Sequence, residues 1–388
     1  MITINDKTKC CGCSACANVC PKNCIIMQSD EKGFLYPVTN EAKCVQCGLC
    51  NKICPFLNFR DIREGKNAYA AYYKDEPVRG VSSSGGLFGR LAEEVLNENG
   101  VVFGAAYSED FKSIKHIGVE KKEDLPKLYG SKYLQSVIGD SYKSVESYLK
   151  ADRSLLFVGT SCQISGLKAY LRKDYDKLLT VDVICHGTPS PLIWRDYVTE
   201  KEQKHDSKIV GVNFRNKRFG WSKSVLLLLF ADGSEYCESG SKDEYMRGFL
   251  TNLYLRESCY KCECKGERVL SDISLGDFWG IESILPNFSD NKGASAVILN
   301  TDKGKAFFEK IKSDLVIEKV NYSDVLKGNP ALVSPVVKPD KSEKFWRLYH
   351  KKGLVKAYKV CLKDTFMRKC YRFARRVCGK IKTTINRK

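Results

Sequence analysis

The sequence contains no apolar run that could cross a membrane. A spanning helix needs about 20 predominantly apolar residues, whereas the run SVLLLLF at Ser224–Phe230 is far shorter. We expect this run to be a buried strand. The amino-terminal segment MITINDKTKC also lacks the apolar stretch of a secretory signal peptide. Both absences favour a protein of the cytoplasm.

Several nucleotide-binding and hydrolase motifs are missing as well. The chain has no G-x-G-x-x-G and no G-x-x-x-x-G-K-S/T, which excludes a standard Rossmann fingerprint and a P-loop. Ser161, Cys162 and His186 could suggest a hydrolase triad. However, no G-x-S-x-G nucleophile elbow and no third partner accompany them. We therefore interpret His186 as a structural residue.

Acidic residues are scarce at the carboxyl end. The net charge of the chain is +18. Residues 341–388 hold 17 Lys or Arg against two acidic residues, whereas the other 340 residues hold 47 basic and 44 acidic ones. The imbalance therefore belongs to one appended segment and does not indicate a basic nucleic-acid-binding fold.

Cysteine, in contrast, is abundant, with 19 residues. In a reducing compartment thiolates bind metal and do not form disulfides. Eight cysteines form two runs of the pattern C-x2-C-x2-C-x3-C-P, which is the spacing of bacterial two-cluster ferredoxins. In that arrangement the fourth cysteine of each run ligates the other cluster. We expect one 4Fe–4S cluster on Cys10, Cys13, Cys16 and Cys54, and another on Cys44, Cys47, Cys50 and Cys20.

Zinc is the competing interpretation, because it also binds C-x2-C pairs. A tetrahedral zinc site has no use for a crossed arrangement that is repeated in register and ends in proline each time. Cys11 and Cys24 fall outside the repeat, and we interpret them as small apolar core residues.

From Asn67 onward, predicted strands and helices alternate, and glycine-rich turns separate most of them. This alternation predicts an α/β body, or an α+β fold when the ferredoxin part is included. The strands between 209 and 237 indicate an antiparallel or mixed portion. Predicted strands are Ala68–Tyr73, Val101–Tyr107, Leu155–Gly159, Leu178–Cys185, Ile209–Arg215, Val225–Phe230 and Ala296–Asn300, and predicted helices are Leu87–Leu96, Cys162–Leu171 and Pro191–Gln203.

A serine–glycine turn, RGVSSSGGLFG at Arg79–Gly89, precedes the first of these helices. Serine and glycine at a helix start leave backbone N–H groups available to a phosphate. Ordinary helix capping explains the same residues equally well.

Further cysteines follow two predicted strands, Cys162 in GTSCQ and Cys185 in ICHG. Ligands gather at the carboxyl ends of strands in α/β folds. Cys259 and Cys262 form a C-x2-C pair, with Cys264 close behind. Together these thiolates could hold a third cubane. The alternative is buried apolar cysteines, with a C-x2-C pair that binds zinc or no metal.

With these motifs in hand, the chain resembles the beta-subunit family of coenzyme F420 hydrogenases and dehydrogenases. The resemblance extends from the cysteine repeat to roughly Val316. It rests on SSSGGLF, YGSKYLQS, FVGTSCQISGL, VDVICHGTPSP, SCYKCECKG and SDISLGDFWGI. This family is also similar to flavin and iron–sulfur reductases that act on chlorophyll precursors. Members with a ferredoxin domain carry FAD and 4Fe–4S clusters.

The resemblance implies residue roles that spacing alone leaves open. Cys162, Cys185, Cys259 and Cys262 match the ligands of a third 4Fe–4S cluster. Ser83, Ser84, Gly85 and Gly86 match a turn at the FAD pyrophosphate. Lys132, Gln163, Arg215 and Asp277 fall in motifs that would line the flavin or substrate pocket. For Lys132 and Arg215 a solvated salt bridge is an equal alternative.

The function that the resemblance implies is an FAD- and iron–sulfur-dependent reductase or dehydrogenase. A low-potential donor such as a ferredoxin would reduce the N-terminal clusters, and electrons would reach an unidentified small-molecule or lipid-linked substrate, for instance a cell-surface polysaccharide precursor. A second hypothesis is an electron-transfer subunit without a substrate of its own. A third is an iron–sulfur sensor or assembly protein. Nothing in the sequence requires a hydrogenase partner or coenzyme F420.

The predicted organisation has three parts, with boundaries at 1–59, 67–340 and 341–388, and two halves of the body meeting near residue 150.

In the last part, a stripe of apolar residues at helical spacing lies among many Lys and Arg. This pattern predicts a basic amphipathic helix for an anionic membrane surface or an acidic partner, or a helix packed on its own domain. We expect no nucleic-acid binding. The stripe consists of Leu362, Phe366, Cys370, Phe373, Val377 and Ile381.

Overall fold

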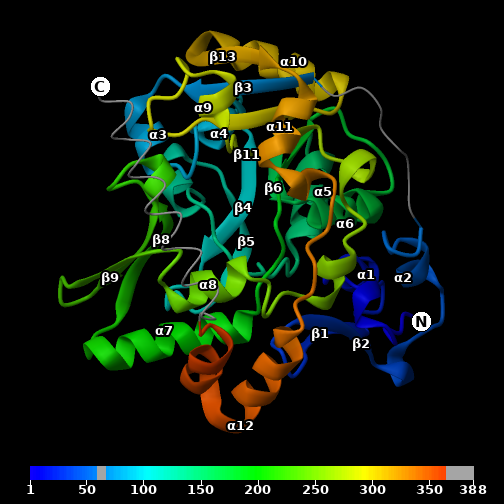
Figure 1. The fold of residues 1–388 in the computed structure, drawn as a ribbon. Helices are drawn as coiled ribbons and strands as arrows, with labels where there is room; N and C mark the ends of the chain where they lie inside the picture. Colours follow the sequence, from blue (N-terminus) through cyan, green and yellow to red (C-terminus); the bar gives the residue numbers. More distant parts are fainter. Residues whose placement is uncertain (59–66, 364–388) are drawn as a thin grey trace. The chain divides into compact units, whose positions relative to one another are not determined.

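The structure is a computed structural model, and it describes residues 1–58 and 67–363. Contacts divide the chain into two compact units, one of residues Met1–Lys338 and one that begins at Pro339. Each unit is described by itself below. The first unit contains both the N-terminal cysteine runs and the α/β body (Figure 1).

The N-terminal part is a β-hairpin flanked by two short helices. Strands β1 (Ile25–Ser29) and β2 (Leu35–Thr39) pair antiparallel. Helix α1 (Ala15–Val19) follows the first cysteines of one run and α2 (Leu49–Lys52) those of the other. Short 3-10 turns, η1 and η2, precede the two runs at Lys7–Lys9 and Glu41–Lys43.

The two cysteine loops have the same backbone geometry. Gly12 and Ser14 in the first run have φ of 70° and 62°, and Gln46 and Gly48 in the second have φ of 52° and 72°. These left-handed residues curl each loop tightly, and the three thiols of each loop line one hollow.

The body is built on one large mixed sheet. Among the described residues its strand order is β13-β3-β12-β11-β7-β6-β4-β5. The inner pairs β4–β6, β6–β7 and β7–β11 are parallel, and the outer pairs are antiparallel. The strands are β3 (Asn67–Tyr73), β4 (Val101–Tyr107), β5 (Ile114–Val119), β6 (Leu155–Thr160), β7 (Leu178–Val183), β11 (Ile273–Asp277), β12 (Ser295–Leu299) and β13 (Leu315–Val320).

Helices cover both faces of this sheet. On one face α4 (Leu87–Asn97) and α10 (Asp302–Ile311) share a core with Val102, Leu156 and Val297. On the other face α5 (Ser141–Lys150) and α6 (Ser161–Leu171) share a core with Val101, Phe103, Leu155 and Phe157. Adjacent strand residues thus point to opposite faces, as the pleat requires. Shorter helices α3 (Glu76–Val81), α9 (Ile281–Ile284) and α11 (Tyr322–Gly328) complete this part.

The core of α5 and α6 also includes residues of the N-terminal part. Cys11, Cys13, Ala15, Ile53 and Phe56 are buried in it. Figure 1 shows α1 beside α6, and the two helices are in contact. Burial of this shared apolar surface fixes the first cysteine loop against the body.

The body also contains a second, smaller sheet, which is separate from the main one. Its strands β8 (Ile209–Asn216), β9 (Val225–Phe230) and β10 (Glu235–Ser239) pair antiparallel. It packs with α7 (Pro191–His205) and α8 (Glu244–Leu250) through aromatic side chains. Trp194, for example, lies 5.0 Å from Phe214 and 4.9 Å from Tyr245, measured between ring centroids.

Most expected elements are present, and the antiparallel portion between 209 and 237 is confirmed. The run at Ser224–Phe230 forms the largely buried strand β9. Predicted bounds of β3, β6, β8 and β12 differ from the observed ones by one residue. The bound of β7 was wrong by two residues, because this strand ends at Val183 and Cys185 lies in the loop that follows. In the body, the sequence pattern missed β5, α5, β11, α10 and β13, and also the shorter helices α3, α8, α9 and α11.

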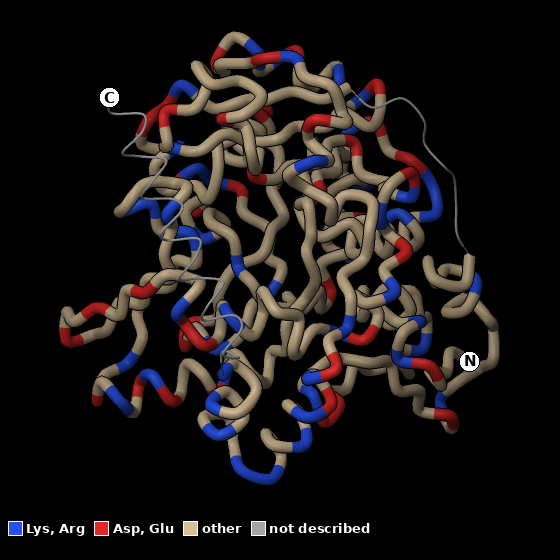
Figure 2. The backbone as a smooth tube through the Cα atoms, viewed as in Figure 1, with Lys and Arg blue, Asp and Glu red and all other residues tan. Residues whose placement is uncertain are grey.

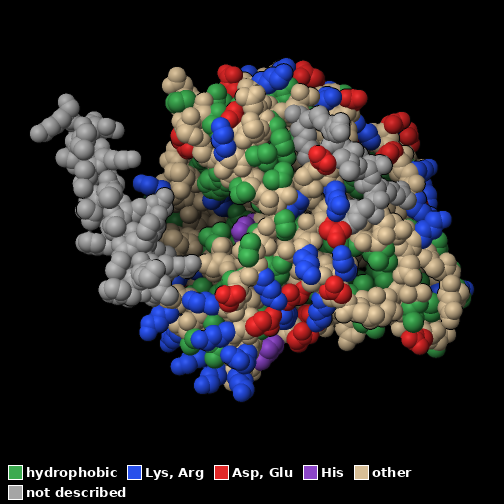
Figure 3. Space-filling model, turned by 45° about the vertical axis from the view of Figure 1, so that its right-hand side comes forward, with side chains coloured by type: hydrophobic (Ala, Val, Ile, Leu, Met, Phe, Trp, Pro, Cys, Tyr) green, Lys and Arg blue, Asp and Glu red, His purple; other side chains and the backbone are tan. Residues whose placement is uncertain are grey.

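The second unit contains helix α12 (Lys341–Cys361), which is two helical segments joined at Gly353, where φ is 73°. Phe345, Trp346, Leu354 and Tyr358 of α12 are buried, whereas seven Lys and Arg of this helix are exposed. Figure 2 colours the Lys and Arg positions of α12 blue along the backbone, and Figure 3 shows a group of basic side chains in blue at the lower left. The predicted amphipathic stripe lies outside the described residues beyond Leu362. Within the described residues, no helix is long and apolar enough to span a bilayer.

Candidate functional site

The first group of candidate ligands combines both cysteine runs. Cys10, Cys13 and Cys16 of the first run and Cys54 of the second line one small hollow, together with Cys11. Its other walls are largely apolar and include Ile2, Ile4, Met27 and Phe56. The four predicted ligands are thus brought together across the repeat.

The second group of candidate ligands combines three cysteines of the second run with one of the first. Cys44, Cys47 and Cys50 line a hollow with Cys20. Cys24 also lies here, with its sulfur 3.3 Å from that of Cys20. Cys47 is exposed, whereas Cys13 and Cys16 in the first group are buried. The two sites therefore differ in their access to water.

The donor chemistry of both hollows fits an iron–sulfur cluster. The donors are thiols, which are soft ligands, and burial raises the pKa of the Cys54 thiol to about 11 and that of Cys16 further. A buried thiol of this kind ionises when a metal compensates the thiolate charge, so cluster binding is coupled to proton release.

A third group of thiols forms within the body. Cys162 is in the first turn of α6, Cys185 follows β7, and Cys259 and Cys262 belong to or follow η5 (Glu257–Lys261). Burial raises the pKa of Cys185, and the nearby Cys259, Cys162 and Cys262 add to this effect. The four cysteines that the resemblance names are therefore neighbours.

Hydrogen bonds to sulfur occur at this third group. The Thr188 N–H donates to Cys259 Sγ at 3.3 Å, and Thr160 Oγ1 lies 3.2 Å from Cys162 Sγ. The ammonium of Lys265 donates to the carbonyl of Cys185 at 2.8 Å. Such contacts stabilise negative charge on a thiolate ligand.

The first and third groups are in direct contact. The Cys11 thiol interacts with the sulfurs of both Cys13 and Cys162. Gly166 of α6 permits this approach, because a Cβ there would lie 2.7 Å from Cys13 Cβ. Cys264 is buried beside the same thiols. Cys11 is thus a buried residue, as expected, and it also lies between two candidate cluster sites.

A cavity of about 590 Å³ lies next to the third group. Cys185 lines it, so the cavity and the thiols share a wall. It lies at the carboxyl ends of β6, β7 and β11, where α/β folds bind ligands. Of the eight residues expected at a flavin or substrate pocket, seven line this cavity: Ser83, Ser84, Gly86, Lys132, Gln163, Arg215 and Asp277.

Gly85 is the exception. Its N–H donates to Ser295 Oγ at 3.0 Å, and a Cβ there would lie 2.6 Å from the carbonyl oxygen of Ala71. The residue is therefore required for close packing on β3 and β12. Its N–H is occupied within the protein and does not face the cavity.

Lys132 is not a solvated salt bridge. Its ammonium donates to the carbonyls of Leu128, Tyr129 and Gly130 at 3.2, 2.9 and 3.2 Å. Burial lowers the pKa of Lys132 to about 7. The residue thus holds one edge of the cavity by binding backbone oxygens.

Arg215 forms a partly buried ion pair with Asp277, with 3.2 Å between Nη2 and Oδ2. The Trp221 indole N–H donates to the same carboxylate at 2.9 Å, and Trp221 stacks on Trp279. Arg215 Nε is buried without a hydrogen-bond partner among the described residues. This donor is available to an oxygen or nitrogen of a molecule in the cavity.

Sequence reasoning missed a polar chain that includes Gln163. Gln163 Nε2 donates to Ser136 Oγ at 2.9 Å, and that hydroxyl lies 2.9 Å from His116 Nδ1. His116 Nε2 lies 3.0 Å from the carbonyl of Val158. Burial lowers the pKa of His116 to about 4, so the ring is neutral at pH 7. Ser136 ends the motif YGSKYLQS, but no role was predicted for it, and no quoted motif contains His116. Their contacts join separate strands and loops, which a local pattern does not reveal.

His186 also lines the cavity, although the sequence suggested a purely structural role. Its Nε2 lies 2.7 Å from Asn252 Oδ1, and its ring meets Phe249 edge-on. These contacts orient the ring at the cavity wall.

Two regions of the chain match models of known protein families. Residues 9–58 match a 4Fe-4S dicluster domain, and residues 152–325 match the C terminus of the coenzyme F420 hydrogenase/dehydrogenase beta subunit. No curated protein matches the chain. A solved structure of the F420-reducing NiFe hydrogenase complex from Methanosarcina barkeri, derivatised with xenon, is similar over 77% of this chain and 91% of the matched chain, with a TM-score of 0.47 and 18% identity. The chain therefore contains a domain that matches the C terminus of the coenzyme F420 hydrogenase/dehydrogenase beta subunit and an N-terminal 4Fe-4S dicluster domain.

Proposed function

We propose that the protein is an iron–sulfur flavoprotein oxidoreductase, in which electrons pass from the dicluster domain through a third 4Fe–4S site to FAD and then to an organic substrate. One observation carries this proposal. The thiol group of Cys162, Cys185, Cys259 and Cys262 meets the first cysteine loop through Cys11 and borders the large cavity through Cys185.

The crossed geometry of the N-terminal thiols supports the ligand assignment. We assign Cys10, Cys13, Cys16 and Cys54 to one cluster and Cys44, Cys47, Cys50 and Cys20 to the other. The hydrogen bonds to Cys162 and Cys259 sulfur support a cluster at the third group.

The cavity is the proposed flavin site. A bound flavin accepts electrons one at a time and releases them as a hydride. Ser83, Ser84 and Gly86 would face its phosphates, and the unpartnered Nε of Arg215 would donate to it. Asp277 and Trp221 hold the Arg215 guanidinium in place.

The part of the cavity wall that reaches solvent is apolar. Val183, Leu250 and Trp279 line the cavity and are all exposed. The Trp279 indole, stacked on Trp221, offers a flat surface for a ring of the substrate. A polysaccharide precursor presents such a ring, and we retain it as the candidate substrate class.

A second candidate function is an electron-transfer subunit that reduces a partner enzyme. The matching family is described as a beta subunit, and this favours a protein that works beside another. Reduced protein that is reoxidised by a partner protein, and by no small molecule, would support this candidate.

Anaerobic purification tests the proposal. We expect about twelve irons per chain, as three cubanes require, and release of FAD on denaturation. About eight irons without flavin would contradict both the third cluster and the reductase function.

Arg215→Met provides a sharper test of the flavin site. The variant should keep its iron and lose most of its FAD, because the cavity loses its available donor. Arg218→Met is the matched control, since Arg218 is exposed and paired with Glu235 at 2.6 Å. Normal FAD content in Arg215→Met would place the flavin elsewhere.

A further inference from the structure

The two N-terminal thiol groups have different electrostatic surroundings. The second group lies at the surface, with Cys47 and Lys22 exposed around its hollow. The first group is buried against the body and next to Arg256. The sequence repeat alone does not distinguish the two groups.

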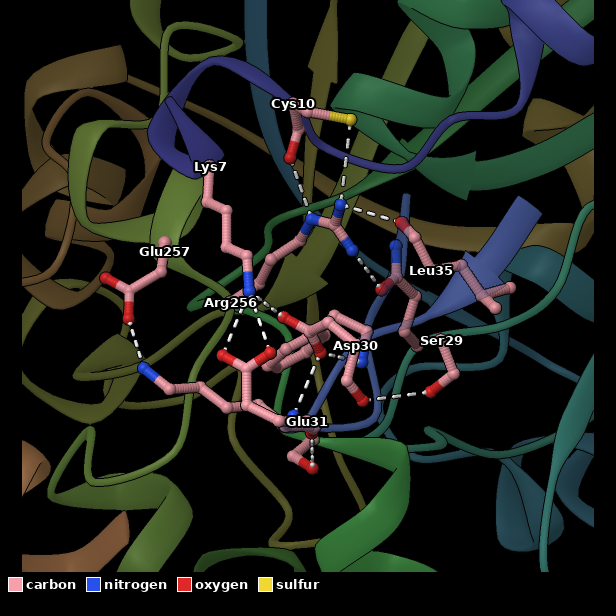
Figure 4. A network of polar contacts seen from close by, with 12 residues as sticks. Lys7, Cys10, Ser29, Asp30, Glu31, Leu35, Arg256 and Glu257 are labelled. Atoms are coloured by element: carbon pink, nitrogen blue, oxygen red, sulfur yellow. Dashed lines mark hydrogen bonds and ion pairs between the residues drawn. The ribbon is translucent and has the colours of Figure 1, made fainter. Parts of the chain in front are cut away.

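Arg256 binds the first cysteine loop through several donors. Its Nε donates to the carbonyl of Cys10 at 2.8 Å, and its Nη2 donates to the carbonyl of Leu35 at 2.9 Å. Nη1 donates to Gln135 Oε1 at 3.0 Å, and Nη2 lies 3.7 Å from Cys10 Sγ. Figure 4 shows the guanidinium pointing toward Cys10.

The charge of Arg256 is both buried and uncompensated. The residue is 1% exposed, and among the described residues none of its partners is a carboxylate. The nearby acids are paired with other cations. Asp30 pairs with Lys7 (Figure 4), and Glu257 pairs with Lys32 and Lys338. The Tyr36 ring lies 4.2 Å from the guanidinium carbon and holds its plane.

We infer that Arg256 makes the first N-terminal cluster site the electron acceptor of the domain, so that electrons enter at the exposed second site and collect at the first, next to the body. This inference rests on the proposed ligand assignment. One electron leaves the second site as one electron arrives at the first, which becomes more negative by one charge. A cation 3.7 Å from a ligand sulfur in a low-dielectric setting stabilises that added charge.

The position of the first site also favours electron flow from the second site toward the body. Cys11 joins the first site to Cys162 of the third group. An electron held at the first site is therefore already beside the next site, whereas the second site faces solvent, where a donor can reach it.

Arg256→Lys and Arg256→Met separate the charge from the hydrogen bonds. Lysine retains the positive charge and loses the planar fork, and methionine retains much of the volume and loses the charge. Lys22→Met is the matched control, because it removes an exposed charge at the second site that water already screens.

The measurement is a redox titration of the reduced holoprotein followed by electron paramagnetic resonance. We expect two distinct midpoint potentials for the N-terminal clusters. Arg256→Met should shift the higher one downward, Arg256→Lys should leave it close to that of the native protein, and Lys22→Met should change neither. Equal shifts in the lysine and methionine variants would overturn the inference, because the hydrogen bonds would then be responsible.

A second experiment does not depend on how well the Arg256 variants fold. Cys47→Ser in the otherwise native chain should alter the lower-potential N-terminal signal, and Cys185→Ala should identify the signal of the third group. If Cys47→Ser altered the higher-potential signal, the inferred order would be wrong. Absence of two N-terminal cluster signals in the native protein would instead contradict the ligand assignment itself.

Discussion

At the scale of single residues, close contacts around the thiols leave little freedom for substitution. Gly166 lies in α6 where the first cysteine loop meets the body, and a Cβ there would lie 2.7 Å from Cys13 Cβ and 2.9 Å from the Tyr142 hydroxyl. Both neighbours are themselves buried. Relief of the overlap therefore requires the loop that carries Cys13 to move.

Gly166→Ala should lower the free energy of unfolding by about 1–3 kcal/mol, the cost typical of overpacking, and should reduce iron content. Thermal unfolding and iron analysis of the anaerobic protein would measure both effects. Gly80→Ala is the control, since Gly80 lies in a helix with no heavy atom within 4 Å of the added Cβ. Equal melting temperatures for the two variants would contradict the packing argument.

His116 is a second residue with a measurable signature. Burial lowers its pKa from 6.5 to about 4, so the unfolded chain binds more protons than the folded chain between these pH values. The free energy of unfolding therefore falls as the pH falls through this window, by about 1.4 kcal/mol for each pH unit.

His116→Gln should remove this dependence. Between pH 7 and pH 5 the melting temperature of the native protein should fall further than that of His116→Gln. Comparison of the two proteins cancels any acid sensitivity of the clusters. His205→Gln should behave as the native protein does, and a similar fall in all three proteins would show that His116 is not responsible.

At the scale of helices and strands, the sequence predicted an element well where a local pattern of apolar and turn residues marks it. The strands Val101–Tyr107 and Val225–Phe230 were predicted with their observed bounds, because their apolar runs end at turn residues. β13 and β11 were missed, since their places depend on partners distant in sequence, β3 for the former and β7 and β12 for the latter. The same limit applies to Gly85, whose neighbours Ala71 and Ser295 come from two other strands.

The site was predictable to the extent that spacing or a motif encodes it. The cysteine spacing predicted which N-terminal thiols come together, and the resemblance predicted the third thiol group and seven of the residues that line the cavity. Roles such as the binding of three carbonyls by Lys132, or the charge of Arg256 beside Cys10, follow from tertiary contacts that no local pattern expresses.

Helix α6 provides a prediction at this scale. Its first turn carries Cys162, and Thr160 and Gln163 form a capping box that satisfies the exposed amides there. Thr160 Oγ1 also contacts Cys162 Sγ. Thr160→Ala should lower the free energy of unfolding by about 1 kcal/mol and weaken binding of the proposed third cluster.

Thr160→Ser retains the hydroxyl and is the matched variant. Thermal unfolding would report the cap, and iron content and the spectrum of the third cluster would report the sulfur contact. A serine variant as unstable as the alanine variant would mean that the threonine methyl group, and not the cap, is important.

At the scale of the whole molecule, the proposed electron route runs inside the first unit, from the hollow of Cys47 to the cavity of Arg215. The second unit contributes none of the proposed ligands. Its described residues carry exposed Lys and Arg along α12 with only Asp340 and Glu343 as acids. The chemistry and the basic segment are therefore separable by experiment.

A chain that ends at Lys338 should retain its iron and FAD, because residues Met1–Lys338 form a compact unit. It should lose affinity for vesicles that contain phosphatidylglycerol, because the basic residues that attract an anionic surface are removed. Flotation of the full-length and shortened proteins, with phosphatidylcholine vesicles as the control, would measure this. Binding of the full chain should also weaken as salt is raised, since screening reduces the attraction. Equal flotation of the two proteins would exclude the basic segment as the membrane contact and leave an acidic protein partner as the candidate for it.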